Sequence, residues 1–249
     1  SFAALLEAQG VDVLLVGDSL GMVLQGHDTT LPVTLDEMVY HTACVARGAK
    51  QIFIISDMPF GTFQISPQET FAHAAKLMAA GAQMVKLEGG AAMVETVQFL
   101  TERGIAVCGH IGLTPQSVHQ LGGYRVQGKT AVDANKLIED AKMLEEAGAF
   151  AIVLELIPHE IAEIITKELT ISTVGIGAGA ACDIQVLVLH DLIGFTFGRQ
   201  PRFVRQYANV SEVISTAITN WMDDVRSGNY PNAEESYGMP EAAKKEMKA

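Results

Sequence analysis

The sequence predicts an α/β fold, a (βα)8 TIM barrel whose first strand is missing. Short apolar segments alternate with longer helical ones, as in repeated βα units around a parallel sheet. Several of the short segments are apolar almost throughout, which is typical of parallel strands that are covered on both faces. The 249 residues are about the usual length of one such barrel. We therefore expect a single barrel domain over residues 1–249.

Seven segments have the length and composition of strands. Each is short, rich in Val, Ile, Leu or Ala, and followed by a turn or a polar residue. The last one has the least clear pattern. The predicted strands are Val11–Val16, Ile52–Ser56, Gln83–Leu87, Ile105–Cys108, Ala149–Leu154, Ser172–Ile176 and Leu192–Phe195.

Helical patterns lie between these strands, and several of them end near a glycine, as helices often do. The predicted helices are Leu35–Gly48, Pro67–Ala80, Ala92–Arg103, Asp133–Ala147 and His159–Leu169. Beyond them we predict a C-terminal helix at about 212–227 and a polar tail over 228–249. We expect the end of that tail to be disordered.

Seven strands fit either an open doubly wound sheet or an eight-stranded barrel that lacks one strand. The chain starts at Ser1, already within a helical pattern and without an initiator Met. For this reason we favour the barrel and expect its first strand to lie upstream of Ser1.

Charge and cysteine content narrow the possible partners. A formal net charge of −12 disfavours binding to nucleic acid or to an anionic membrane. The three cysteines, Cys44, Cys108 and Cys182, are far apart and have no zinc-ligand spacing, which fits a reducing compartment. The sequence shows neither a membrane span nor a secretory signal. We expect a cytoplasmic protein that binds small molecules or further copies of itself.

Charged residues follow several predicted strands. In barrels and open parallel sheets alike, the carboxyl ends of the strands meet on one face, where catalytic groups collect. Four acids and one lysine are therefore expected on a single rim. The residues at or just past the strand ends are Asp18, Asp57, Lys86, Glu88, His110, Glu155 and the run Gly177–Gly179.

Acids at strand ends can also be ordinary helix N-caps, an equally good explanation for Asp18 alone. It is a weaker explanation for the set, because Glu88 and Glu155 directly follow apolar strand residues, where an unpartnered carboxylate is costly. Convergent carboxylates need a cation. Oxygen ligands without a histidine or cysteine cluster favour magnesium.

Lys86 and Glu88 are two residues apart and so face the same side of their strand. They form either a structural salt bridge or a site where the lysine holds an anionic substrate beside the metal. The turn Gly17–Gly21 can offer backbone N–H groups and the Ser19 hydroxyl to a carboxylate.

Two further features remain open. The run Gly175–Gly179 is not the G-x-G-x-x-G pattern and no acid follows at the expected offset, so it predicts either close approach to a ligand or close helix packing. His110 is either a hydrogen-bonded structural histidine or a proton carrier or ligand.

These strand-end residues lie in stretches that closely resemble the ketopantoate hydroxymethyltransferase family. The similarity runs from Val11 to about Tyr207 and resumes weakly at Ser227–Pro231. So many matches in one order are highly specific. The matching stretches are Val16–Met22, Gln25–Thr34, Ser56–Phe60, Val85–Gly90, Val107–Gln116, Gly122–Gly128, Leu154–Glu155, Gly175–Gly179 and Leu187–Asp191.

The resemblance implies a βα-barrel enzyme of pantothenate synthesis. Such an enzyme transfers a hydroxymethyl group from 5,10-methylenetetrahydrofolate to 3-methyl-2-oxobutanoate and forms 2-dehydropantoate. Carried over to this sequence, it implies that Asp18 and Asp57 bind Mg²⁺ and substrate, with Glu88 as a third acid at the metal. Ser19 and Lys86 would contact the substrate carboxylate. The family also forms homo-oligomers, specifically homodecamers of two stacked pentameric rings.

The same resemblance implies that Glu155 is the general base. A divalent cation, Mg²⁺ or another, would stabilise the enolate of the 2-oxo acid. Desolvation at the end of an apolar strand would make Glu155 a stronger base. The chain departs from the family at Ile184, where glycine is usual, at Glu235, where histidine is common, and in the absent N-terminal strand.

Two alternatives differ in class. One is another magnesium barrel enzyme that acts on 2-oxo acids, of the isocitrate lyase and phosphoenolpyruvate mutase type; against it, Val107–His110 has no preceding lysines. The other is a non-catalytic barrel that binds a metabolite or serves as a scaffold. The complete set of acids and Lys86 disfavours it.

Overall fold

The computed structural model describes residues 1–196, 198 and 200–247. The chain divides into two compact units, Ser1–Leu187 and Val188–Ala249, and each unit is described here by itself. A single barrel domain over the whole chain stays a prediction. In the described parts of the chain, no helix has the length and apolar content that a membrane span requires.

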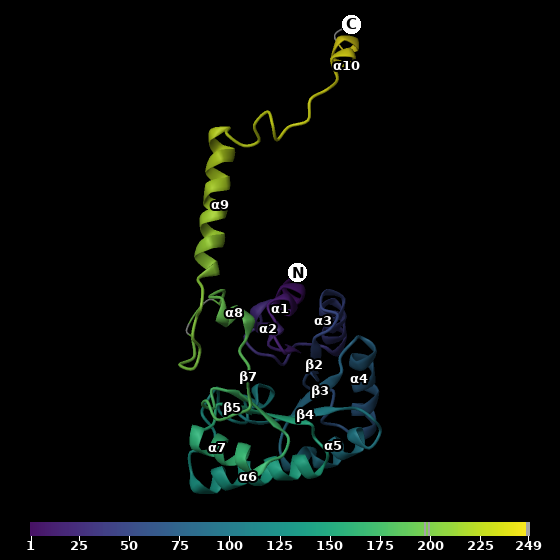
Figure 1. Ribbon diagram of the computed structural model, residues 1–249, viewed down its shortest axis with the longest axis vertical. Helices are drawn as coiled ribbons and strands as arrows, with labels where there is room; N and C mark the ends of the chain where they lie inside the picture. Colours follow the sequence, from purple (N-terminus) through teal and green to yellow (C-terminus); the bar gives the residue numbers. More distant parts are fainter. Residues whose placement is uncertain (197, 199, 248–249) are drawn as a thin grey trace. The chain divides into compact units, whose positions relative to one another are not determined.

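The first unit contains a parallel sheet whose strands follow one another in chain order. Neighbouring parallel strands need a crossover connection, and helices provide most of these connections. Figure 1 shows the curled sheet with α4, α5, α6 and α7 along its outer side. The strands are β1 (Val13–Val16), β2 (Phe53–Asp57), β3 (Met84–Glu88), β4 (Val107–Gly112), β5 (Ala151–Glu155), β6 (Ser172–Ile176) and β7 (Ile184–Gln185).

The helices of the first unit start where the sequence supplies capping groups. Thr34 forms a capping box with Glu37, and the Ser66 hydroxyl accepts the Glu69 N–H one residue before Pro67. The helices are α1 (Phe2–Ala8), α2 (Leu20–Val23), α3 (Leu35–Gly48), α4 (Pro67–Ala79), α5 (Val94–Thr101), α6 (Ala131–Glu146) and α7 (His159–Glu168), with 3-10 turns η1 (Ala91–Met93) and η2 (Pro115–Ser117).

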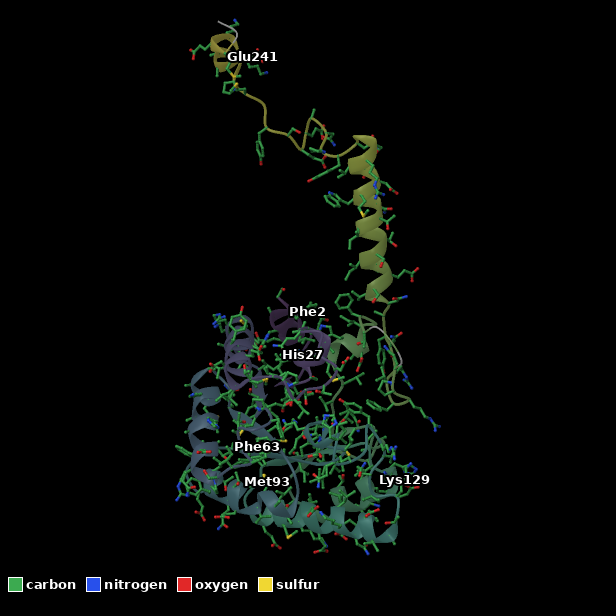
Figure 2. The ribbon with its side chains drawn as sticks, turned by 180° about the vertical axis from the view of Figure 1, so that it is seen from behind. Phe2, His27, Phe63, Met93, Lys129 and Glu241 are labelled. Carbon is green, nitrogen blue, oxygen red and sulfur yellow. The ribbon has the colours of Figure 1, made fainter. Side chains whose placement is uncertain are left out.

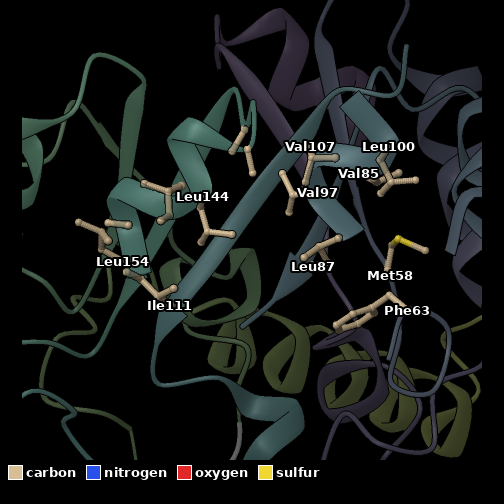
Figure 3. Close-up of a cluster of buried hydrophobic side chains, with 14 of the residues drawn as sticks. Met58, Phe63, Val85, Leu87, Val97, Leu100, Val107, Ile111, Leu144 and Leu154 are labelled. Atoms are coloured by element: carbon tan, nitrogen blue, oxygen red, sulfur yellow. The ribbon is translucent and has the colours of Figure 1, made fainter. Parts of the chain in front are cut away.

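The main core fills the space between the sheet and its outer helices. Val85 and Leu87 from β3 pack there with Leu100 of α5, and Leu144 of α6 covers β4 and β5 (Figure 3). Because strand side chains alternate, the intervening residues face the opposite, inner side of the sheet. A smaller apolar cluster lies on that inner side, made of Ile55, Met84, Cys108, Ala151, Val153 and Val174.

The inner face also carries the charged residues of the strand ends. Lys86 and Glu88 follow Met84 at intervals of two, and His110 follows Cys108 in the same way. The prediction that Lys86 and Glu88 share one face is therefore confirmed by the register of β3. Charged groups lie above a small apolar layer, at the carboxyl ends of the strands.

The prediction of a seventh strand at Leu192–Phe195 is wrong. The seventh strand is β7, which pairs with β6 through Val174 and Ile184. The expected segment overlaps helix α8 (Leu189–Leu192) instead, where the Leu192 N–H donates to the Val188 carbonyl. Short apolar runs do not distinguish a strand from a helix by periodicity, and here local hydrogen bonds favour the helix.

The second unit contains α8, α9 (Val210–Ser227) and α10 (Glu241–Glu246). The predicted helix at about 212–227 is α9, which starts two residues earlier because the Asn209 side chain caps it by accepting the Glu212 N–H. Within the expected polar tail, α10 begins at Glu241 (Figure 2), and the last two residues of the chain, where we expected disorder, lie outside the described residues. An eight-stranded barrel is not confirmed, since the described residues form seven strands.

Candidate active site

The register of the sheet places the predicted site residues on neighbouring strands. Asp57, the last residue of β2, lies beside Lys86 of β3. Glu88 lies beside His110 of β4, and the end of β4 lies beside Glu155 of β5. The strand-end residues far apart in the chain therefore meet at one edge of the sheet, as predicted.

Asp18 and Asp57 come together at the first two strand ends. The Asp18 backbone N–H donates to Asp57 Oδ2 at 3.0 Å, and both side chains are buried. Asp57 Oδ1 lies 2.9 Å from Lys86 Nζ. A side chain at Gly17 would place its Cβ 3.0 Å from Ser19 Oγ and 3.5 Å from Asp57 Oδ2. Gly17 therefore leaves room beside both oxygens.

Charge is unevenly balanced in this part of the site. Burial, then the nearby charges of Asp57 and Glu88, raise the pKa of Asp18 to about 7, although Lys86 opposes them. Burial by itself would lower the pKa of Lys86, but the carboxylates of Asp57, Glu88 and Asp18 raise it above its ordinary value. Lys86 thus stays charged beside three acidic side chains.

His110 lies at the centre of the cluster. Its Nδ1 is 3.2 Å from Lys86 Nζ and 3.5 Å from Glu88 Oε1, and its Nε2 is 3.1 Å from Glu155 Oε2. Burial and the Lys86 charge would lower the pKa of His110, but the two carboxylates raise it to about 9. A pKa of about 9 keeps the ring protonated at neutral pH, so its positive charge lies beside the carboxylates of Glu88 and Glu155.

Glu155 is held by the backbone around it. The Leu113 N–H donates to the Glu155 carbonyl at 2.8 Å. Gly112 has a φ of +94°, and any side chain there would collide with that carbonyl. The next residue, Leu156, has a left-handed φ of +47°, which is strained for leucine. The Glu155 side chain is 16% exposed, so it faces a more open environment than we expected.

Sequence reasoning missed Gln116. It lies in η2, past the end of β4, and its side-chain amide donates to Asp18 Oδ2 at 2.8 Å. Its backbone N–H donates to Glu88 Oε2 at 3.0 Å. An uncharged residue several positions beyond a strand end has no feature in a single sequence that marks it as functional. The only indication was that Gln116 lies in Val107–Gln116, one of the stretches that resemble the family.

The donor atoms fit a divalent cation in part. Asp18 and Asp57 supply hard oxygen ligands, and a cation would offset both the burial and the repulsion from Asp57 that raise the pKa of Asp18. Glu88 differs, because its two oxygens already face Gln116 and His110. Across the described ranges, no three His, Cys, Asp or Glu side chains are grouped closely enough to hold a metal. The residues therefore fit a cation through Asp18 and Asp57, and direct ligation by Glu88 stays a prediction.

Gly179, which follows β6, packs closely against a helix. A Cβ at Gly179, whose φ is +86°, would lie 2.5 Å from the Cβ of His159 at the start of α7. For the run Gly175–Gly179 we considered close approach to a ligand and close helix packing. The contact of Gly179 supports close helix packing.

Comparison with known proteins decides the family. Residues 1–233 match the family model described as ketopantoate hydroxymethyltransferase. The chain belongs to this family. It is 61% identical over 237 residues to the 3-methyl-2-oxobutanoate hydroxymethyltransferase of Nitrosomonas europaea. The aligned residues make up 95% of this chain and 88% of that protein. The Nitrosomonas eutropha protein of the same name is 59% identical with the same coverage.

Solved structures with a similar fold are far more distant in sequence. Phosphonopyruvate hydrolase in complex with oxalate and Mg²⁺ has a TM-score of 0.57 at 14% identity, covering 94% of this chain and 84% of that one. Phosphoenolpyruvate phosphomutase from Streptomyces platensis subsp. rosaceus has a TM-score of 0.58 at 13% identity, with 99% and 86% covered. These similarities show the fold alone.

Two of the residues at which we expected departures from the family lie in the described parts of the chain. Ile184 is a residue of β7 and is 38% exposed. Glu235 accepts the Asn232 N–H through Oε2 at 3.0 Å in the second unit.

Proposed function

We propose that this protein transfers a hydroxymethyl group from 5,10-methylenetetrahydrofolate to 3-methyl-2-oxobutanoate and forms 2-dehydropantoate. One observation carries the proposal: within a chain of the ketopantoate hydroxymethyltransferase family, Glu155 joins the buried acid cluster through the 3.1 Å contact to His110. A base and a set of carboxylates suited to a cation thus lie in one site. That pairing suits removal of a proton next to a keto group.

The metal in this proposal is Mg²⁺, with other divalent ions as possible substitutes. Asp18 and Asp57 would hold it, with Glu88 as the third acid. When bound, a divalent cation acts as a Lewis acid toward the keto and carboxylate oxygens of the substrate. Lys86 supplies a second positive charge next to Asp57 and, with the Ser19 hydroxyl, binds the substrate carboxylate.

Glu155 acts as the general base. It accepts the proton from carbon 3 of the substrate, and the electron pair of that C–H bond forms the new bond to the methylene carbon of the folate. The two C–N bonds of the methylene group break, water supplies the hydroxyl group to that carbon, and the folate nitrogens take up one proton from water and one from Glu155, so that tetrahydrofolate leaves. The His110 ring, 3.1 Å away through its Nε2, keeps the Glu155 carboxylate oriented.

Family membership does not favour the alternative of an isocitrate lyase or phosphoenolpyruvate mutase type of reaction, because the structures that carry those activities share only the fold. We further propose that the complete fold is an eight-stranded barrel and that the protein is cytoplasmic. Its assembly would be a homo-oligomer, specifically a homodecamer. Light scattering on the purified chain measures the assembly directly.

The experiment that tests the function is an assay for 2-dehydropantoate with both substrates, with and without a chelator. The proposal expects product with Mg²⁺, loss of product on chelation, and its return when Mg²⁺ is restored. Cleavage of a 2-methylisocitrate-like substrate, with no 2-dehydropantoate formed, would assign the alternative instead.

A further inference from the structure

Gln116 occupies a buried position between the ends of three strands. Its side-chain Nε2 donates to Asp18 Oδ2 at 2.8 Å and to the Met58 carbonyl at 2.9 Å. Its backbone N–H donates to Glu88 Oε2 at 3.0 Å, and its Oε1 lies 3.4 Å from the Nε2 of Gln64. Only 6% of the residue is exposed, so these contacts replace water.

The contacts connect the strand ends that carry all the predicted metal ligands. Asp18 follows β1, Met58 directly follows Asp57 at the end of β2, and Glu88 ends β3. Both Nε2 hydrogens of Gln116 are used, so the amide cannot turn without losing a buried hydrogen bond.

The chemistry of an amide suits this position. An N–H donor stabilises an ionised carboxylate without adding a second positive charge that would repel a metal ion. It also engages Oδ2 of Asp18 and leaves Oδ1 for another partner. A lysine or arginine at this position would neutralise the acid that a cation needs.

We propose that Gln116 is a positioning residue of the metal site, which holds the Asp18 and Glu88 carboxylates in the arrangement that binds a divalent cation. The inference rests on the cation site of the proposed function and not on the identity of the substrates. Outer hydrogen-bond partners of metal ligands commonly contribute about 10- to 100-fold to metal affinity.

The test is a Mn²⁺ titration of the full chain after metal removal, followed by electron paramagnetic resonance. Gln116→Met keeps the length of the side chain and removes its donor. We expect its Mn²⁺ affinity to fall about 10- to 100-fold, while product formation recovers at saturating Mn²⁺. Gln120→Met is the matched control, because Gln120 is exposed in the same connection, and its affinity should equal that of the wild type.

A second variant keeps the test decisive if Gln116→Met does not fold. Gln116→Asn retains the amide but is one methylene too short for both partners, and the same loss of affinity is expected. Wild-type Mn²⁺ affinity in a folded Gln116 variant, or a wild-type protein that binds no Mn²⁺, would overturn the inference. A protein whose Mn²⁺ affinity depends on Gln116 but which makes no 2-dehydropantoate would support it and reject the proposed function.

Discussion

Glu155 and His110 depend on each other at the end of the sheet. The Glu155 carboxylate helps to raise the pKa of the His110 ring, and the protonated ring in turn places a positive charge beside that carboxylate. The sequence placed His110 and Glu155 at the ends of two predicted strands but left the role of His110 open. The two side chains meet only because β4 pairs with β5, and one sequence does not show that pairing.

Replacing the proposed base tests its role directly. Glu155→Gln keeps the shape of the side chain and removes its ability to accept a proton, so kcat should fall by about 10²- to 10⁴-fold while Mn²⁺ binding is largely kept. Steady-state kinetics and a Mn²⁺ titration measure the two effects. Glu160→Gln, at an exposed acid of α7, is the control. Unchanged turnover in Glu155→Gln would refute the assignment.

His110 predicts a pH dependence of stability. Its pKa is about 9 in the folded protein and 6.5 in the unfolded chain, so the stabilisation is complete below pH 6.5 and is lost as the pH rises through 9. The free energy of unfolding of the metal-free protein should therefore fall by on the order of 3 kcal/mol between pH 6.5 and 10. Denaturant unfolding at several pH values measures it. His110→Gln should remove most of that slope; an equally steep slope in the variant would show that another group is responsible.

At the scale of secondary structure, the sequence predicted most elements but not all. Six strands and the five helices α3 to α7 follow from apolar periodicity and glycine ends, signals that each segment carries by itself. Strand β7 is too short to give such a signal, because it depends on pairing with β6. Gln116 was missed for a related reason, since its importance comes from contacts with residues distant in sequence.

The last residue of β4 is predicted to be sensitive to the addition of a single methyl group. Gly112→Ala forces a side chain against the Glu155 carbonyl at a left-handed φ, so we expect a loss of about 2–4 kcal/mol in the free energy of unfolding and a lower kcat. Gly104→Ala is the matched control, with a similar φ of +85° but open space around its Cβ. It should cost only about 1 kcal/mol. Equal losses in the two variants would contradict the proposed constraint on Glu155.

At the scale of the molecule, the formal net charge is −12 because acidic side chains outnumber basic ones. Acidic side chains also outnumber basic ones in the candidate active site. The residues that the sequence placed on one rim do meet, yet in the described part of the chain no three His, Cys, Asp or Glu side chains are grouped closely enough to hold a metal. A bound cation and its substrate would supply the missing ligands and charge, which a single sequence cannot show. The central claim is therefore that metal and base act together on carbon 3.

Hydrogen exchange at carbon 3 of 3-methyl-2-oxobutanoate tests that claim most directly. Proton NMR in D₂O, without folate, follows loss of the carbon 3 proton signal. We expect exchange with wild-type protein and Mg²⁺, and none after chelation, in Asp57→Asn or in Glu155→Gln. Exchange that persists at the wild-type rate without metal, or without the Glu155 carboxylate, would contradict the account.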